Sequence, residues 1–130
     1  MRYVPPFASL NHDFVFGSDD GAPWVKIGYN QFEALLRKIL AAVEFDEEWY
    51  RKQYPDVDEA VREGLVKSGR EHFINSGYFE GRLPGEVEVD EEWYFETYPD
   101  IAEAVTSGEI ASAQQHFLAF GYAEGRQPAP

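Results

Sequence analysis

Residues 43–84 read VEFDEEWYRKQYPDVDEAVREGLVKSGREHFINSGYFEGRLP, and residues 87–128 read VEVDEEWYFETYPDIAEAVTSGEIASAQQHFLAFGYAEGRQP. The two stretches align without a gap, and 23 of the 42 aligned residues are identical. Self-similarity at a fixed period is typical of stacked supersecondary units. We therefore predict two helical repeats in tandem, over residues 45–86 and residues 87–130. We call residues 43–84 the first copy and residues 87–128 the second copy.

Each copy is predicted to form three short helices. In the first copy Asp46 is a good N-cap, and the two glutamates that follow suit the positive end of a helix. This helix is expected to end at Tyr54, because Pro55 disfavours helical geometry in the residue before it. Asp56 is then expected to cap a second helix, with Glu59 completing a capping box.

Glycines and a serine predict the remaining boundaries of each copy. Gly64 is expected to end the second helix, since glycine tolerates the left-handed conformation after a helix. Ser68 is expected to open a third helix with Glu71 as its box partner, and Gly77 to terminate that helix. The matching residues of the second copy are Asp90, Asp100, Gly108, Ser112, Gln115 and Gly121.

Residues 30–44 precede the duplication and predict an amphipathic leader helix. Asn30 is the expected cap and Glu33 its box partner. The apolar residues at helical spacing are Phe32, Leu35, Leu36, Ile39, Leu40 and Val43. This helix is expected either to cap the first repeat or to mediate a homodimer through residues 30–44.

Residues 1–29 form an N-terminal arm with a different pattern. Residues 1–13 are expected to be extended. Two apolar stretches, residues 14–16 and residues 24–27, flank a turn-rich segment and predict a small β-hairpin. The predicted fold class is therefore mainly α: two tandem three-helix repeats preceded by an amphipathic helix and a small β-hairpin.

The net charge of −13 is spread unevenly. Residues 1–44 carry four Lys/Arg against five Asp/Glu, residues 45–84 carry six against nine, and residues 85–130 carry one against ten. Such a field repels phosphate backbones and attracts basic protein surfaces. We therefore expect a protein partner with a basic surface and no direct contact with nucleic acid.

The chain lacks the sequence signals of export and of membrane insertion. The start, MRYVPPFASLNHDF, has no basic region followed by an apolar run, as a secretory signal would. No segment approaches the roughly 18 apolar residues that a membrane-spanning helix needs. We expect a cytoplasmic protein with no membrane insertion.

The carboxylate pairs do not form a catalytic pattern. General acid–base chemistry needs two carboxylates that converge on one cleft. Glu47 and Glu48 are adjacent on a predicted helix, so their side chains point about 100° apart. The same holds for Glu91 and Glu92. No nucleophile, base or phosphate-binding loop stands out, and we expect no enzyme and no cofactor.

His72 and His116 occupy matched positions in the two copies. A metal site would need further ligands at suitable spacing, and the chain has only one other histidine, His12, and no cysteine. We therefore expect no metal site. The two histidines are interpreted as structural, each satisfied by a neighbouring carbonyl or carboxylate.

The aromatic residues allow two interpretations. Trp49 and Trp93 are expected to anchor the cores of their copies. Tyr50, Tyr78 and their matches could also bind sugar, because tyrosine rings are amphipathic. Exposed tyrosines would favour sugar binding and buried ones a protein adapter. Arg82 is expected to clamp its own copy by pairing with nearby carboxylates.

The motif DEEWY…YPD…EAV…G…HF…GY.EGR.P in both copies resembles a helical repeat of bacterial proteins. In these proteins units of the form YPDV…EAV…G…EHF…G..EGR.P recur beside glycosyltransferase domains or in large surface repeat proteins. The resemblance covers residues 43–128. It implies an accessory role in an exopolysaccharide or cell-envelope context.

The charge differences between the copies have one sign, because the second copy loses basic residues of the first. Arg51 and Lys52 of the first copy become Phe95 and Glu96 in the second, and three further basic residues are also lost. If Phe95 faces solvent, it is an apolar side chain in a negative field, which both steers and anchors a basic partner.

The predicted function is thus a non-catalytic acidic adapter or scaffolding protein. The predicted partner-binding residues are Phe95, Glu96, Glu91, Glu92, Tyr94 and Tyr122. Two alternatives stay open. One is a carbohydrate-binding accessory module, and the other is an acidic mimic that occupies a nucleic-acid-binding protein.

Overall fold

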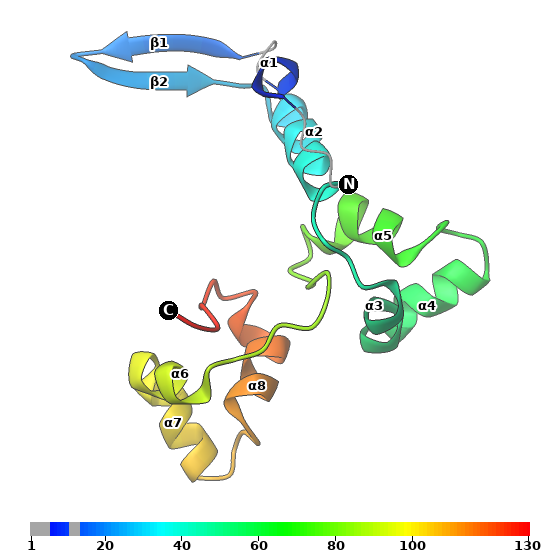
Figure 1. Ribbon diagram of the computed structural model, residues 1–130, viewed down its shortest axis with the longest axis vertical. Helices are drawn as coiled ribbons and strands as arrows, with labels where there is room; N and C mark the ends of the chain where they lie inside the picture. The colour runs from blue at the N-terminus through cyan, green and yellow to red at the C-terminus, as the bar shows by residue number, and fades with distance from the viewer. Residues whose placement is uncertain (1–5, 11–13) are drawn as a thin grey trace. The chain divides into compact units, whose positions relative to one another are not determined.

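The computed structural model describes residues 6–10 and 14–130, and the chain divides into two units, Met1–Glu44 and Phe45–Pro130. The chain is mainly helical, with one two-stranded antiparallel sheet in the first unit (Figure 1). The predicted mainly α class with a small hairpin is therefore confirmed.

The first unit contains helix α1 (Phe7–Leu10), strands β1 (Val15–Asp19) and β2 (Ala22–Lys26), and helix α2 (Tyr29–Leu40). The two strands are joined by only two residues, Asp20 and Gly21, with φ of 49° and 79°. Positive φ at both positions is the type I′ geometry that best matches the twist of a hairpin. The strands are consequently longer than the sequence predicted.

Two expectations for the first unit are wrong in detail. Residues 1–13 were expected to be extended, but Phe7–Leu10 form a helical turn; residues 1–5 and 11–13 lie outside the described part of the chain. The leader helix spans Tyr29–Leu40 rather than residues 30–44, and its N-cap is Gly28, without a side-chain cap. Asn30 therefore lies inside the first turn and does not cap it.

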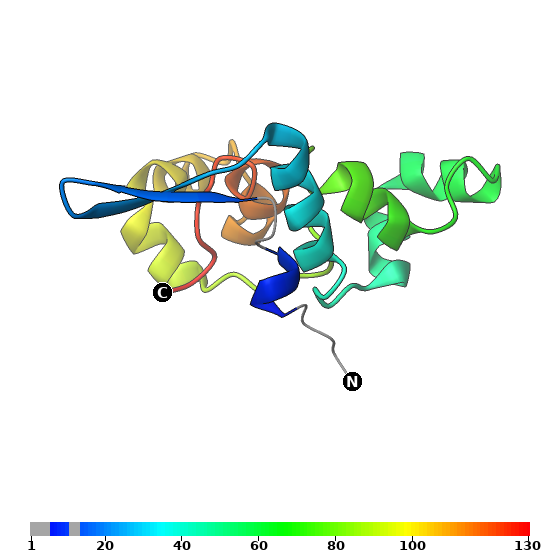
Figure 2. The same cartoon turned by 90° about the horizontal axis from the view of Figure 1, so that it is seen from above.

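The second unit begins with helices α3 (Glu47–Gln53), α4 (Pro55–Arg62) and α5 (Gly69–His72), followed by the π-helical turn η1 (Phe73–Gly77). The same order then recurs as α6 (Glu91–Thr97), α7 (Pro99–Thr106), α8 (Ala113–His116) and η2 (Phe117–Gly121) (Figures 1 and 2).

Local capping signals set several of these boundaries. Asp46 accepts a hydrogen bond from the Trp49 amide at 2.9 Å, and Ser68 accepts one from the Glu71 amide at 3.0 Å, as predicted. Asp90 and Ser112 do the same in the second copy.

The expected cap at Asp56 is wrong. Helix α4 begins at Pro55, with Tyr54 as its N-cap and no side-chain capping bond. Proline suits the first helical position because its missing N–H has no partner there. Asp56 therefore lies in the first turn, where its carboxylate is available for a contact distant in sequence.

Gly64 and Gly108 follow their helices in the left-handed conformation, as predicted, and η1 ends at Gly77, also as predicted. The left-handed glycine that follows η1 is not Gly77 but Gly81, whose φ is +76°, and the Arg82 amide donates to the Gly77 carbonyl at 2.8 Å. This bond closes a Schellman motif. In the second copy η2 ends at Gly121, and the left-handed glycine is Gly125.

The core of each copy centres on a tyrosine rather than on the expected tryptophan. Tyr50 and Tyr94 are both 0% exposed, whereas Trp49 and Trp93 are only half-buried. The buried cluster of the second copy comprises Leu83, Tyr94, Ile101, Ala113 and Phe117. Since Leu83 belongs to the first copy, the two copies contribute to one hydrophobic cluster.

Candidate partner-binding surface

One ion pair joins helix α3 of the first copy to α4, and a second pair within α4 shares its carboxylate. The Nε of Arg51 donates to Oδ1 of Asp58 at 2.7 Å, and Arg62 pairs with the other oxygen of Asp58. The hydrogen bond from Arg51 is the main reason that the pKa of Asp58 lies below its ordinary value. Two basic residues are therefore neutralised in part by one acid.

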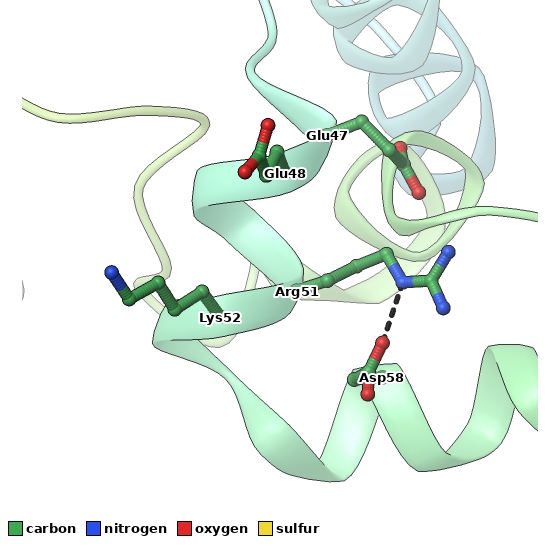
Figure 3. A pocket seen from close by; sticks show the side chains of 5 residues that line it. All are labelled: Glu47, Glu48, Arg51, Lys52 and Asp58. Carbon is green, nitrogen blue, oxygen red and sulfur yellow. Dashed lines mark hydrogen bonds and ion pairs between the residues drawn. The ribbon is translucent and has the colours of Figure 1, made fainter.

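A hollow of about 520 Å³ lies beside this network, and we call it the α3 hollow. Its walls are Glu47, Glu48, Arg51, Lys52 and Asp58 (Figure 3). Arg51 reaches across to Asp58, while Lys52 points away from the pair (Figure 3). Acidic and basic side chains are thus mixed on this surface.

The side chain of Glu47 forms hydrogen bonds with the backbone of α5. Its carboxylate accepts hydrogen bonds from the amides of Gly69 at 2.6 Å and Arg70 at 3.0 Å. Carboxylates are stabilising at a helix N-terminus, where backbone amides lack intrahelical partners. In the first copy this glutamate has a structural role.

The second copy lacks the whole Arg51–Asp58–Arg62 network. The matching residues are Phe95, Ala102 and Thr106. Phe95 is half-buried and packs against the hydrophobic cluster of the second copy. The condition that Phe95 faces solvent is therefore met only in part.

The glutamates of α6 do not bind backbone amides in the way that Glu47 does. Gln114, which replaces Arg70, binds the backbone of Val87 and Val89 at 2.7 and 3.0 Å. Glu91 is exposed and accepts no hydrogen bond in the part of the chain that the structure describes. We call Glu91, Glu92, Phe95 and Glu96 the acidic face of α6; its three carboxylates are all exposed.

Tyr94 must be removed from the predicted partner-binding set. Its side chain is 0% exposed, and its hydroxyl lies 2.9 Å from Nδ1 of His116. Burial raises the pKa of Tyr94 above its ordinary value. A partner cannot touch this ring without unfolding the copy.

The same pairing explains the two matched histidines. The Tyr50 hydroxyl lies 3.0 Å from Nδ1 of His72, as Tyr94 does from His116. Both histidines are therefore structural as expected, although the partner is a tyrosine hydroxyl rather than a carbonyl or carboxylate.

Tyr122, the last member of the predicted set, lines a hollow that none of the residues of the acidic face of α6 lines. It is half-buried, and we call this second hollow of about 520 Å³ the tyrosine hollow. The walls of this hollow are Tyr78, Phe79, Glu80, Gly81, Tyr122 and Ala123. Tyr78 is 36% exposed and Phe79 41%, and their rings meet edge to face with centroids 5.4 Å apart.

Arg82 clamps its own copy, as predicted. Its guanidinium donates to both oxygens of Asp56, at 2.9 and 2.8 Å, and to Glu80 at 2.9 Å. It also lies 4.9 Å from the centroid of the Tyr54 ring. The hydrogen bond from Arg82 lowers the pKa of Asp56. Arg126 makes the matching contacts in the second copy.

Among residues 6–10 and 14–130, no group of three or more histidines and carboxylates is arranged to hold a metal ion. None of the helices formed by these residues is long and apolar enough to cross a membrane.

No protein-family model matches the chain, and no curated protein or solved structure is significantly similar to it. The contacts of α3 and α6 are therefore the basis on which a function can be argued.

Proposed function

We propose that the protein is a non-catalytic acidic adapter that offers the acidic face of α6 to a protein partner with a basic surface. In this proposal residues 45–86 and 87–130 act as two tandem three-helix repeats, and only the second binds the partner. The observation that carries the proposal is the joint replacement of Arg51, Asp58 and Arg62 in the second copy.

The replacement changes the charge of one helix surface. In α3 the residues Glu47, Glu48, Arg51 and Lys52 balance to zero. The matching residues of α6, which form its acidic face, sum to −3. Arg126 is the single basic residue after residue 84, and it is already bound to Asp100 and Glu124. The field over α6 is therefore not cancelled within the second copy.

The half-buried Phe95 complements this field. Carboxylates steer a basic partner and select against acidic ones, but exposed charges add little affinity by themselves. An aromatic ring held by packing on one side can supply apolar contact on the other at a low cost in conformational entropy. Phe95 and the three glutamates together have the composition of a small binding site for a basic segment.

The resemblance of the copies to units beside bacterial glycosyltransferase domains supports a polysaccharide or cell-envelope context for this adapter. It does not enter the argument for the acidic face, which rests on the contacts of α3 and α6 alone.

Charge reversal with a matched control tests the adapter. Glu92→Lys changes the acidic face of α6, and Glu48→Lys makes the same change at the matching exposed position of α3. Proteins captured from the native host by the wild-type chain are identified, and the affinity of the main one is measured at low and high salt. We expect Glu92→Lys to weaken binding about tenfold or more and to reduce its salt dependence, with Glu48→Lys close to wild type. Equal losses in both variants would show that only total charge matters.

A carbohydrate-binding module is a second candidate, favoured by the exposure of Tyr78 and Phe79 in the tyrosine hollow. Partly exposed rings beside Glu80 could stack on a sugar and bind its hydroxyls. Titration of the protein with defined bacterial oligosaccharides, followed by NMR, tests this candidate. Shifts that disappear in Tyr78→Ala but persist in Glu92→Lys would support sugar binding and separate it from the adapter. Unchanged spectra across the oligosaccharides would refute it.

A further inference from the structure

The tyrosine hollow lies where the two copies meet. Its walls come from residues 78–81 of the first copy and from Tyr122 and Ala123 of the second. The turn at Gly81 approaches the second copy closely, since a Cβ at Gly81 would lie 3.2 Å from that of Ala123. The hollow is therefore built by both copies together, and neither copy forms it alone.

Aromatic rings that pack against the core form much of these walls. Tyr78 meets the buried Phe73 edge to face with ring centroids 6.2 Å apart, and Tyr122 meets the buried Phe117 at the same distance. Phe79 stands at 84° to Tyr78 with centroids 5.4 Å apart. Both tyrosines are thus held by the core of their own copies, and two of the three rings stand nearly at right angles.

The charges around the hollow are mainly negative. Among the residues that line it, Glu80 is the one with a charged side chain, which is 47% exposed. Arg82 donates to Glu80 through Nε, but its other two nitrogens donate to Asp56, so these three groups sum to −1. Arg126 and its two carboxylates also sum to −1. Since residues 71–130 contain no basic residue besides these two arginines, negative charge prevails at the hollow.

Aromatic rings beside a carboxylate are the groups that recognise organic cations. The face of an aromatic ring carries partial negative charge and attracts a cation within about 6 Å of its centre. Rings nearly at right angles approach a rounded cation from two sides, whereas a sugar stacks on one flat face. The volume of about 520 Å³ also lies in the range of roughly 300–1,000 Å³ that is usual for small-ligand sites.

We propose that the tyrosine hollow binds an alkylammonium cation, a positive nitrogen surrounded by methyl or methylene groups. These groups contact the rings of Tyr78, Phe79 and Tyr122, and the carboxylate of Glu80 balances the charge. The cation takes the place of the sugar considered above for the same hollow. The site shares no residue with the acidic face of α6, so its ligand does not depend on the adapter function.

A charged ligand and its neutral analogue provide the first test. Choline carries a trimethylammonium group, and the alcohol in which carbon replaces that nitrogen has the same shape without the charge. Each is titrated into the full chain and followed through the NMR signals of backbone amides, with sodium chloride as the ionic control. We expect saturable shifts at Gly81 and Ala123 with choline, and binding about threefold weaker or more with the neutral alcohol.

The outcomes of this titration separate the ligand classes. Equal binding of choline and the neutral alcohol would mean that the hollow is merely apolar. Shifts reproduced by sodium chloride would mean that choline only screens charge. Either result would overturn the cation site, as would spectra that choline leaves unchanged. Shifts at Gly81 with oligosaccharides but not with choline would assign the hollow to sugar instead.

Two pairs of matched variants provide the second test. Glu80→Gln removes the charge from the wall, and Glu124→Gln removes the matching carboxylate, which binds Arg126 in the same way but does not line the hollow. Phe79→Leu keeps the wall apolar without an aromatic face, and Phe120→Leu makes the same change at an exposed ring that does not line the hollow. We expect Glu80→Gln and Phe79→Leu to weaken choline binding about threefold or more, with both controls close to wild type. Circular dichroism checks the fold of each variant, and equal losses in variant and control would refute the site.

Discussion

The hydroxyl oxygen of Tyr50 occupies the space in which a side chain at Gly77 would begin: a Cβ there would lie 2.1 Å from it. The hydroxyl is held in place by Nδ1 of His72, 3.0 Å away. The π-helical turn at Phe73–Gly77 brings the backbone this close to the tyrosine. A glycine inside a helix is therefore explained by a contact with a residue 27 positions earlier.

This contact predicts a non-additive pair of substitutions. Gly77→Ala should destabilise the fold by about 1–3 kcal/mol, as overpacking of a dense core does. Tyr50→Phe should cost about 1–3 kcal/mol, because Nδ1 of His72 loses its partner. The double variant should be more stable than the sum implies by about 1 kcal/mol, since the overlap with the hydroxyl is removed and the new methyl then meets Nδ1 of His72 at 3.2 Å and the Cζ of residue 50 at 3.4 Å. Urea unfolding measures all three, and strict additivity would contradict the steric explanation.

The burial of His116 predicts a loss of stability in mild acid. Burial is the main cause, and Arg126 the next, of a pKa of His116 below its ordinary value of 6.5. Below pH 6.5 the unfolded chain therefore binds a proton at this residue that the folded chain does not. Stability from this group is present above pH 6.5 and is lost as the pH falls below it. Unfolding at pH 7.5 and 5.5 should differ less in His116→Gln than in the wild type; an unchanged difference would exclude this histidine as the cause.

The clamp at Arg82 predicts that lysine is a poor substitute. Arg82→Lys keeps the charge but loses the two parallel hydrogen bonds to Asp56 and the flat contact with Tyr54. We expect a loss of about 0.5–1 kcal/mol, a small value because Asp56 is exposed. Arg62→Lys, at a more exposed arginine, serves as the control and should change the free energy of unfolding less. Equal effects would mean that the geometry of the clamp is unimportant.

The matched positions of the two copies predict that the Arg51–Asp58 ion pair can be recreated in the second copy at positions 95 and 102. Phe95→Arg should destabilise the second copy by about 1–3 kcal/mol, because an apolar contact is replaced by a charge without its partner. Adding Ala102→Asp recreates the Arg51–Asp58 pair and should recover part of the loss. Thermal unfolding follows both variants. If Ala102→Asp brings no recovery, the two copies hold these helices in different ways.

Structural features that depend on a few neighbouring residues could be predicted from the sequence. Asp46 and Ser68 cap their helices as predicted, because a cap needs only an amide three residues ahead. The hairpin was also predicted, although the sequence did not show that Asp20 and Gly21 alone would form the turn.

Contacts between residues distant in sequence could not be predicted from the sequence. Asp56 follows a proline and has the signature of a cap, but its partner is Arg82, 26 residues later. Gly77 has the signature of a helix stop, and only the fold reveals that it makes room for Tyr50. In a seven-residue helix the side chains of Trp49 and Tyr50 are both candidates for the core, and the packing of α4 and α5 decides between them.

Among the predicted binding residues, too, exposure that follows from charge was predictable and burial that follows from distant contacts was not. Glu91, Glu92 and Glu96 are exposed, as their charge implies, and their role stays a prediction. Tyr94 was included as an amphipathic ring, yet it is buried, because adjacent residues on a helix face different directions. The partial burial of Phe95 could not be predicted either, because it comes from packing against a cluster whose members are distant in sequence.

The exclusion between Tyr50 and Gly77 also constrains how the chain can change over time. Alanine at position 77 overlaps the hydroxyl at position 50 unless that hydroxyl is lost first, so the cost of either substitution depends on the other. The same dependence links Gly121 and Tyr94, where a Cβ would lie 2.5 Å from the hydroxyl. Each copy therefore contains two positions that do not change independently, whereas α3 and α6 beside them differ between the copies.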